Sequence, residues 1–98
     1  MHPADINAAL RKAGSSQAKV SRWFAEHGEQ PVSPAAVHLV ISGRGSSARI
    51  ARRISEITGV PVARLWPGRY APLAAEQAAD RAARAARAAE RQARKGAK

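Results

Sequence analysis

Residues 32–53 read VSPAAVHLVISGRGSSARIARR, and this stretch joins a segment without charged side chains to a strongly basic one. Ser33 followed by Pro34 is a typical N-cap and first-turn pair of a helix. Apolar side chains then recur at helical spacing until Gly43, a residue type that often ends helices. They are Val37, Val40 and Ile41. The pattern predicts a short helix that buries one face and leaves the other uncharged.

The basic segment that follows is predicted to form another helix. Ser46 or Ser47 can cap its start, and Gly59 with Pro61 ends it. Its isoleucines form one stripe while its arginines point elsewhere. The isoleucines are Ile50, Ile54 and Ile57, and the arginines are Arg49, Arg52 and Arg53. The positive charge of residues 32–53 is therefore expected on this helix and in the loop before it.

Glycine and proline divide the rest of residues 1–72 into segments of helical length. One helix is expected from Pro3 to Gly14, and a second, capped by Ser15 or Ser16, ends at Gly28. Residues 60–70 are too interrupted by proline for more than a single turn. The expected core side chains of these segments are Ile6, Leu10, Val20, Trp23, Phe24, Val62, Leu65 and Trp66, with His27 as a further candidate. No alternating β-branched run predicts a strand, so we expect a small all-α domain of four to five helices.

The composition selects a polyanion as partner. Seventeen Lys and Arg residues against seven Asp and Glu residues give a formal charge of +10. Nucleic acid is the leading candidate. An anionic membrane surface is the main competitor, but the basic segments lack the large apolar face that such binding requires.

The same composition argues against several other classes. The chain has no cysteine and only three scattered histidines, so neither a metal site nor a cofactor is predicted. No nucleophile lies near a base in a catalytic motif, which argues against an enzyme. No apolar run approaches the roughly 20 residues of a membrane span, and the first residues do not resemble a signal peptide. We therefore expect a soluble protein.

The composition shifts at Leu73. Residues 73–98 contain 12 alanines, seven Lys or Arg residues and three acidic residues. Such a segment favours a helix but offers little apolar surface for packing. We predict a division into a domain of residues 1–72 and a basic tail of residues 73–98. The tail could be a solvated disordered segment, a helical arm that follows phosphates, or a weak alanine-lined coiled coil.

Several short helices, two of them joined by a tight connection, fit the helix-turn-helix architecture, in which residues 34–42 would enter the major groove of DNA. Candidate contacts to base edges are Ser33, Ala35, Ala36, His38 and Ser42. Candidate phosphate contacts lie in the next loop and helix. They are Arg44, Ser46, Ser47, Arg49, Arg52 and Arg53.

Three stretches carry a family resemblance: HPADINAALRKAG, VSPAAVHLVISGRG and ARIARRISEITGVPVARLWPGRY. They resemble the Ner-like regulators of Mu-type transposable phages, which belong to the lambda-repressor-like helix-turn-helix superfamily. The most specific part is LWPGRY after TGVP. The resemblance implies a DNA-binding repressor of early phage genes that acts in the cytoplasm of the bacterial host, in association with the nucleoid.

The turn departs from the usual motif. The residue four positions before Gly28 is the bulky Phe24, and Ser33 follows the glycine by five positions rather than about two. If Ser21 is the small residue of the motif, the connection is longer than usual. The sequence thus predicts a DNA-binding transcriptional regulator with a lengthened turn, which binds double-stranded DNA and could form a homodimer on it. An architectural or transposition-accessory protein with little sequence preference is the alternative.

Overall fold

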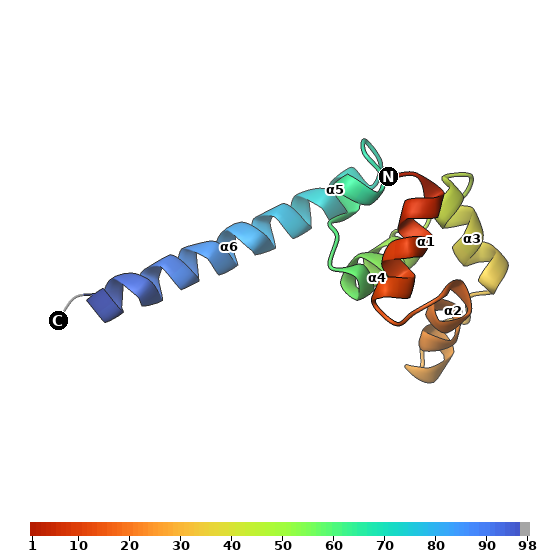
Figure 1. The fold of residues 1–98 in the computed structure, drawn as a ribbon, viewed down its shortest axis with the longest axis horizontal. Coiled ribbons are helices and arrows are strands. Elements are labelled where there is room, and N and C mark those ends of the chain that lie inside the picture. The colour runs from red at the N-terminus through yellow and green to blue at the C-terminus, as the bar shows by residue number, and fades with distance from the viewer. Residues whose placement is uncertain (97–98) are drawn as a thin grey trace.

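Six helices follow one another along residues 1–96, which are the residues that the computed structural model describes. Their bounds are α1 Pro3–Lys12, α2 Gln17–Glu26, α3 Pro34–Ser42, α4 Ala48–Thr58, α5 Val62–Leu65 and α6 Ala71–Gly96. These 96 residues contain no strand, which confirms the all-α fold predicted from the sequence. Helices α1 to α5 form the body of the protein, and α6 projects from it (Figure 1).

Side-chain caps decide where the central helices begin. The hydroxyl of Ser16 accepts a hydrogen bond from the backbone N–H of Lys19 at 3.2 Å, so Ser16 rather than Ser15 caps α2. Ser33 caps α3 in the same way, as the sequence predicted. Ser47 rather than Ser46 caps α4, because its hydroxyl accepts from the N–H of Ile50 at 3.3 Å. Each of these caps satisfies a backbone donor that the helix itself leaves unpaired.

One apolar core lies between the helices of the body. All of the predicted core side chains in α1, α3 and α5 are buried, together with most of those in α2 and α4. Two predicted core residues, Trp23 and Ile57, are only half-buried and pack against the edge of the core. His27 is exposed at the C-cap of α2. Its ring stacks on Trp23 with centroids 4.2 Å apart, outside the core.

Helix α6 contacts the body only through its first turns. Leu73 is buried, and Ala74 and Gln77 are half-buried, whereas every residue from 78 to 94 is exposed. The helix therefore extends the molecule to 56 Å along its longest axis, against 29 and 24 Å along the others. The last two residues of the predicted tail, 97 and 98, lie outside the described residues. The division at residue 72 stays a prediction, which the contacts of Leu73 and Gln77 make testable.

Candidate nucleic-acid interface

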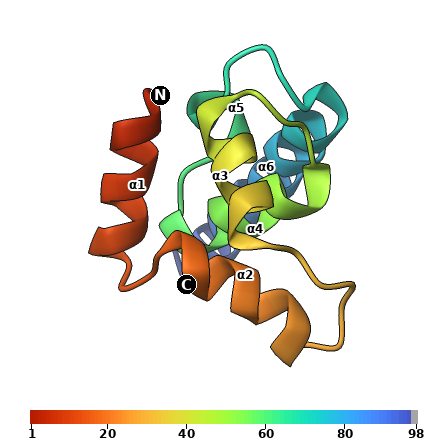
Figure 2. The ribbon, with the colours of Figure 1, turned by 90° about the vertical axis from the view of Figure 1, so that its right-hand side faces the viewer.

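Helices α2 and α3 form the helix-turn-helix pair, and residues 27–33 connect them (Figure 2). Gly28 takes a left-handed φ of 70° directly after the C-cap of α2. Near the other end of the connection, the hydroxyl of Ser21 in α2 donates a hydrogen bond to the carbonyl of Val32. The lengthened turn is therefore tied back to α2 immediately before the N-cap of α3. Ser21 supplies a small side chain where the connection crosses α2.

Arg49 of α4 lies against the same connection. Its Nη1 donates to the carbonyl of Gln30 at 3.1 Å and lies 3.5 Å from Oε2 of Glu29. The guanidinium carbon also lies 4.8 Å from the centroid of the Phe24 ring, which is within the range of a cation–π contact. Arg49 thus fastens the start of α4 to the turn of the helix-turn-helix pair. The guanidinium that the sequence assigned to phosphate already has these protein partners.

The outward face of α3 carries no charged side chain and is open to solvent. Its exposed residues are Ser33, Pro34, Ala35, His38 and Leu39. Leu39 is 44% exposed, which makes it a large apolar side chain on this surface. Ala36 is half-buried and packs against the core, so it lies farther from the outward face than its sequence position suggested. Since α3 keeps its other face buried, this outward face is free to enter a major groove.

The serines of the predicted site are partly committed to the backbone. Ser33 and Ser47 cap α3 and α4 through their hydroxyl oxygens. The hydroxyl of Ser42 donates to the carbonyl of Leu39 at 3.0 Å. Ser46 is exposed in the loop between α3 and α4. A capping hydroxyl accepts through its oxygen and keeps its own proton for another acceptor, so Ser33 and Ser47 can still donate to DNA.

Arg44 is the exposed cation of the loop that follows α3. It forms no ion pair within the described part of the chain, in contrast to all three arginines of α4. Its backbone N–H donates to the carbonyl of Leu39 at 3.0 Å, which fixes the backbone beneath the side chain. Arg44 is therefore held at the C-terminal end of α3 with a guanidinium that is available to a phosphate.

Two residues of the LWPGRY stretch hold this loop, a role that sequence reasoning missed. Nη1 of Arg69 donates to the carbonyl of Gly43 at 2.6 Å, and the hydroxyl of Tyr70 accepts from the N–H of Ser47 at 3.2 Å. Tyr70 has a φ of 55°, an uncommon conformation for a tyrosine. The sequence predicted Trp66 as a core residue. Trp66 is buried, whereas Tyr70 also reaches from the core edge to the loop.

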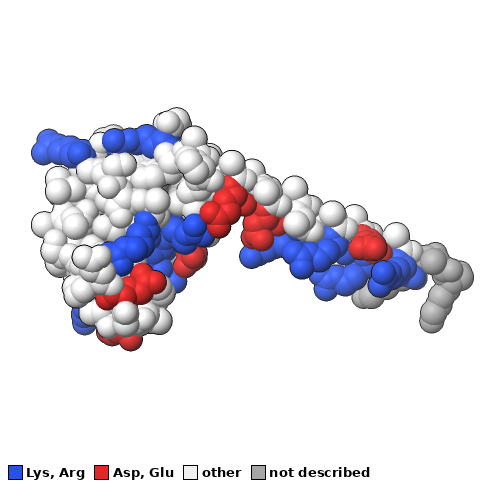
Figure 3. All heavy atoms as spheres, turned by 180° about the vertical axis from the view of Figure 1, so that it is seen from behind, with Lys and Arg blue, Asp and Glu red and all other residues white. Residues whose placement is uncertain are grey.

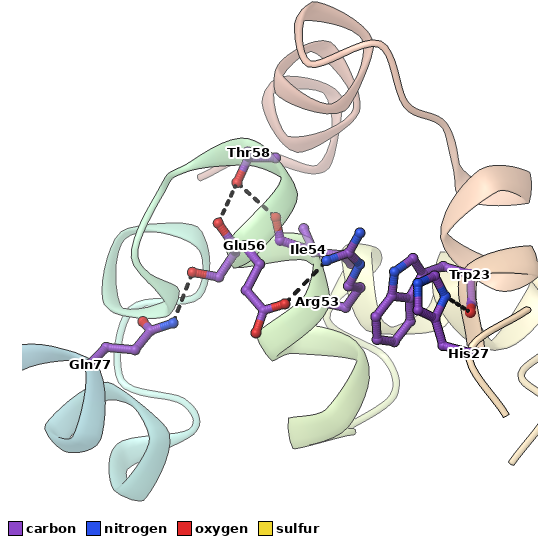
Figure 4. A network of polar contacts seen from close by, with 8 residues as sticks. Trp23, His27, Arg53, Ile54, Glu56, Thr58 and Gln77 are labelled. Carbon is purple, nitrogen blue, oxygen red and sulfur yellow. Dashed lines mark hydrogen bonds and ion pairs between the residues drawn. The ribbon is translucent and has the colours of Figure 1, made fainter. Parts of the chain in front are cut away.

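The other two arginines of α4 face neighbouring helices. Arg52 forms two hydrogen bonds of 3.0 Å to the carboxylate of Glu76 in α6. These bonds raise the pKa of Arg52 and hold the pKa of Glu76 below its ordinary value. Arg53 pairs with Glu56 at 3.2 Å, and its guanidinium carbon lies 4.2 Å from the centroid of the Trp23 ring (Figure 4). Both are thus directed toward α6 and α2 rather than grouped with α3.

Residues 1–96 hold no group of three His, Asp or Glu side chains placed to bind a metal ion. None of the six helices has the length and apolar character needed to cross a membrane.

Comparison with known proteins agrees with the helix-turn-helix geometry. Neither the curated proteins nor the solved structures include a match to this chain. A family model described as winged helix-turn-helix DNA-binding matches residues 1–83, which include the whole body and the first turns of α6. The part of the chain that the structure describes contains no β-strand that could form a wing. On the strength of this match, the chain belongs to the winged helix-turn-helix DNA-binding family.

Proposed function

We propose that the protein is a transcriptional regulator that places the outward face of α3 in the major groove. The observation that carries this proposal is the solvent-open, uncharged face of α3 next to Arg44, in a chain that belongs to a DNA-binding family. A recognition helix needs one buried face and one free face, and a low charge on it is compatible with reading base edges.

The proposed contacts divide by chemistry. His38 can hydrogen-bond a base edge, and Ala35 can touch a thymine methyl group. The loop cation Arg44 and the hydroxyls of the neighbouring serines hold phosphates. These serines are Ser46 and Ser47. Ser33 can donate its hydroxyl proton to a base edge, whereas Ser42, which donates to the carbonyl of Leu39, can accept from one through its oxygen. Ala36 packs against the core and is half-buried, so only the exposed part of its side chain could contact DNA in the major groove.

The arginines of α4 act differently in this proposal. Arg49, Arg52 and Arg53 each pair with a glutamate, so a direct phosphate contact requires that the phosphate replace a carboxylate. Such an exchange is feasible for exposed pairs, because they contribute little to stability. Without exchange, these arginines still add positive potential behind the helix-turn-helix pair.

We further propose repression of early phage genes in a bacterial host, where the protein would act in the cytoplasm and associate with the nucleoid. The support is the resemblance of TGVPVARLWPGRY to Ner-like regulators. The part that Arg69 and Tyr70 play in holding the α3–α4 loop gives that stretch a structural purpose beside the recognition helix. Two copies would meet on DNA, with α3 of each in successive turns of the groove.

The experiment is selection of bound duplexes from a random pool, followed by footprinting on the DNA that flanks the protein's own coding region. We expect an enriched sequence and a footprint with half-sites about 10 bp apart. The His38→Ala variant should change which sequences are enriched. Selection without any enriched sequence would contradict the proposed regulator.

The second candidate is an architectural protein that coats DNA. It is favoured by the small number of hydrogen-bonding side chains on α3 and by the charge of +10. Binding isotherms on selected and random duplexes distinguish the two functions. A regulator should prefer its site by roughly 10³-fold or more, whereas an architectural protein should show nearly equal affinities.

A further inference from the structure

Helix α6 carries a row of arginines along one side. The row consists of Arg81, Arg84, Arg87, Arg91 and Arg94. Spacings of three and four residues bring these side chains to the same side of a helix. Figure 3 shows Lys and Arg along one side of α6 and uncharged residues along the other. We call this set the α6 arginine row.

The row keeps most of its charge unpaired. Arg84 pairs with Asp80 at 3.0 Å and Arg94 with Glu90 at 3.5 Å, both within the helix. Arg81, Arg87 and Arg91 form no ion pair with any described residue. All five side chains are exposed. The row is therefore a cationic surface in which three of the five arginines form no ion pair within residues 1–94.

Three residues hold the start of α6 against the body. Leu73 is buried in the core, and the carboxylate of Glu76 holds Arg52 through two hydrogen bonds. The side chain of Gln77 accepts from the N–H of Val62 at 3.0 Å and donates to the hydroxyl of Ser55 at 2.9 Å (Figure 4). Because these contacts involve both α4 and α5, they fix the direction in which α6 leaves the body.

That direction is away from the recognition helix. In Figure 1, α3 lies at one end of the molecule, and α6 extends from the other. Figure 2, seen from the α3 end, shows α3 in front and α6 behind the body. The arginine row spans about 20 Å of helix, since each residue adds about 1.5 Å. A duplex that lies on α3 is thus separated from the row by the body.

We propose that the α6 arginine row binds the phosphates of a second DNA duplex, so that one chain joins two duplexes. The inference rests on the proposed binding of DNA by α3. Duplex DNA fits the row because it carries one negative charge per about 1.7 Å of axis, and arginine forms forked hydrogen bonds to phosphate oxygens. A row of about 20 Å matches about six base pairs at about 3.4 Å each. Contacts to phosphates carry no sequence information, so the row binds without sequence preference.

The test uses the full chain and two mixed-sequence duplexes, one biotinylated on beads and one fluorescent and free. Wild type should carry the free duplex onto the beads at low salt. The triple variant Arg81→Gln/Arg87→Gln/Arg91→Gln should lose this co-capture but still bind a single duplex through α3. For binding to the second duplex, the slope of log affinity against log salt should be smaller than in wild type by up to about 3, because three phosphate contacts are removed.

A matched control places glutamines on the opposite side of the same helix. Ala82→Gln/Ala86→Gln/Ala89→Gln keeps every charge and should retain co-capture. The reciprocal variant His38→Ala/Arg44→Gln should also lose co-capture, while it still binds a single duplex through α6. If α3 and α6 are two separate sites, changing either one should abolish co-capture, and each variant should still bind a single duplex through the other site.

Several outcomes overturn the inference. Co-capture by the arginine variant at the wild-type level would show that the row is not the second site. If that variant loses single-duplex binding as well, α3 and α6 hold the same duplex. A change from dimer to monomer in sedimentation of the free arginine variant would assign the bridging to a protein dimer. Wild type that binds a duplex but captures no second one refutes only this inference, whereas wild type that binds no duplex refutes the proposed function.

Discussion

Arg44 and Arg49 are five residues apart, yet their surroundings assign them different tasks. Arg44 is exposed in the α3–α4 loop without an ion pair in the described residues. Arg49 contacts Glu29, the carbonyl of Gln30 and the ring of Phe24. The first guanidinium is exposed to solvent, and the second holds the turn before α3.

The Arg44→Gln variant should therefore affect binding alone. We expect an unchanged melting temperature, because no side-chain contact of the body is lost. Affinity should fall by a similar factor on all duplexes, and the slope of log affinity against log salt should decrease by about 0.9, the effect of one phosphate contact. Binding isotherms over a salt series measure both effects. A loss restricted to one sequence would assign Arg44 to base recognition instead.

The Arg49→Gln variant should affect stability first. Removing the cation–π contact and a hydrogen bond to Gln30 should lower the free energy of unfolding by about 1 kcal/mol. Affinity for all duplexes should also decrease, because the turn before α3 is less well held. Thermal unfolding and binding isotherms measure these two effects. Unchanged stability with a reduced salt slope would instead show that Arg49 contacts phosphate directly.

At the scale of the element, two adjacent aromatic residues of α2 should contribute differently to the free energy of unfolding. The side chain of Phe24 is 1% exposed, whereas Trp23 is half-buried at the edge of the core. Phe24→Ala should cost about 3 to 5 kcal/mol, the range for a large side chain lost from a core. Trp23→Ala should cost roughly half as much, since less of its area leaves water. Urea unfolding measures both, and equal losses would place Trp23 in the core.

The attachment of α6 should depend on pH through Glu76. Its hydrogen bonds to Arg52 hold the pKa of this carboxyl below the ordinary value of 4.5. A lowered pKa stabilises the folded state above about pH 4.5, and this contribution is lost as the pH falls through the lowered value. Wild type should therefore melt slightly above Glu76→Gln near neutral pH, and the difference should vanish in acid. The effect is small because the pair is exposed.

The control for this prediction is Glu90→Gln. Glu90 pairs with Arg94 within α6, in a part of the helix where every residue is exposed. Its replacement should leave the melting temperature of the body unchanged. A pH-independent difference between wild type and Glu76→Gln would show that the Arg52–Glu76 pair is not what fastens α6.

At the scale of the whole molecule, short-range signals predicted the helices, and long-range contacts had to come from the structure. Caps and apolar spacing act within a few residues, so the ends of α3 and its buried face could be read from Ser33, Pro34 and Gly43. The partner of Arg52 could not, because Glu76 lies 24 positions away and the sequence alone does not choose among the seven acidic residues of the chain. The contacts of Arg69 and Tyr70 with the α3–α4 loop are long-range in the same sense.

The sequence indicated which residues belong to the candidate site, but it did not indicate how all of them are arranged in space. Residues 33 to 46 lie together because they share one helix and its following loop. The arginines of α4 seemed equivalent in the sequence, yet Arg49 contacts the α2–α3 connection, Arg52 pairs with α6, and Arg53 pairs within α4 and lies over the ring of Trp23. The direction of α6 depends on Leu73, Glu76 and Gln77, whose contacts no local pattern reveals.

Two truncations test the division into domain and tail. Deleting residues 81–98 removes seven cations and one acidic residue, and residues 81–94 of this segment are all exposed, so the melting temperature should hardly change. Deleting residues 73–98 also removes buried Leu73 and both hydrogen bonds of Gln77, so the melting temperature should fall. Both shortened proteins should bind DNA more weakly at low salt, and the difference from wild type should shrink as salt rises.

Preference among duplexes should persist in the shorter deletion, because the α3 face and Arg44 remain. Thermal unfolding of the three proteins and isotherms over a salt series give the answer. If deletion of residues 73–98 leaves the melting temperature unchanged, the boundary at residue 72 holds and the first turns of α6 contribute nothing to the body. If deletion of residues 81–98 lowers the melting temperature, the deleted part of α6 stabilises the fold, although residues 78–94 are exposed in the structure. If only the deletion of residues 73–98 lowers the melting temperature, the turns that contain Glu76 and Gln77 belong to the body rather than to the tail. The folded domain would then end after these turns and not at residue 72.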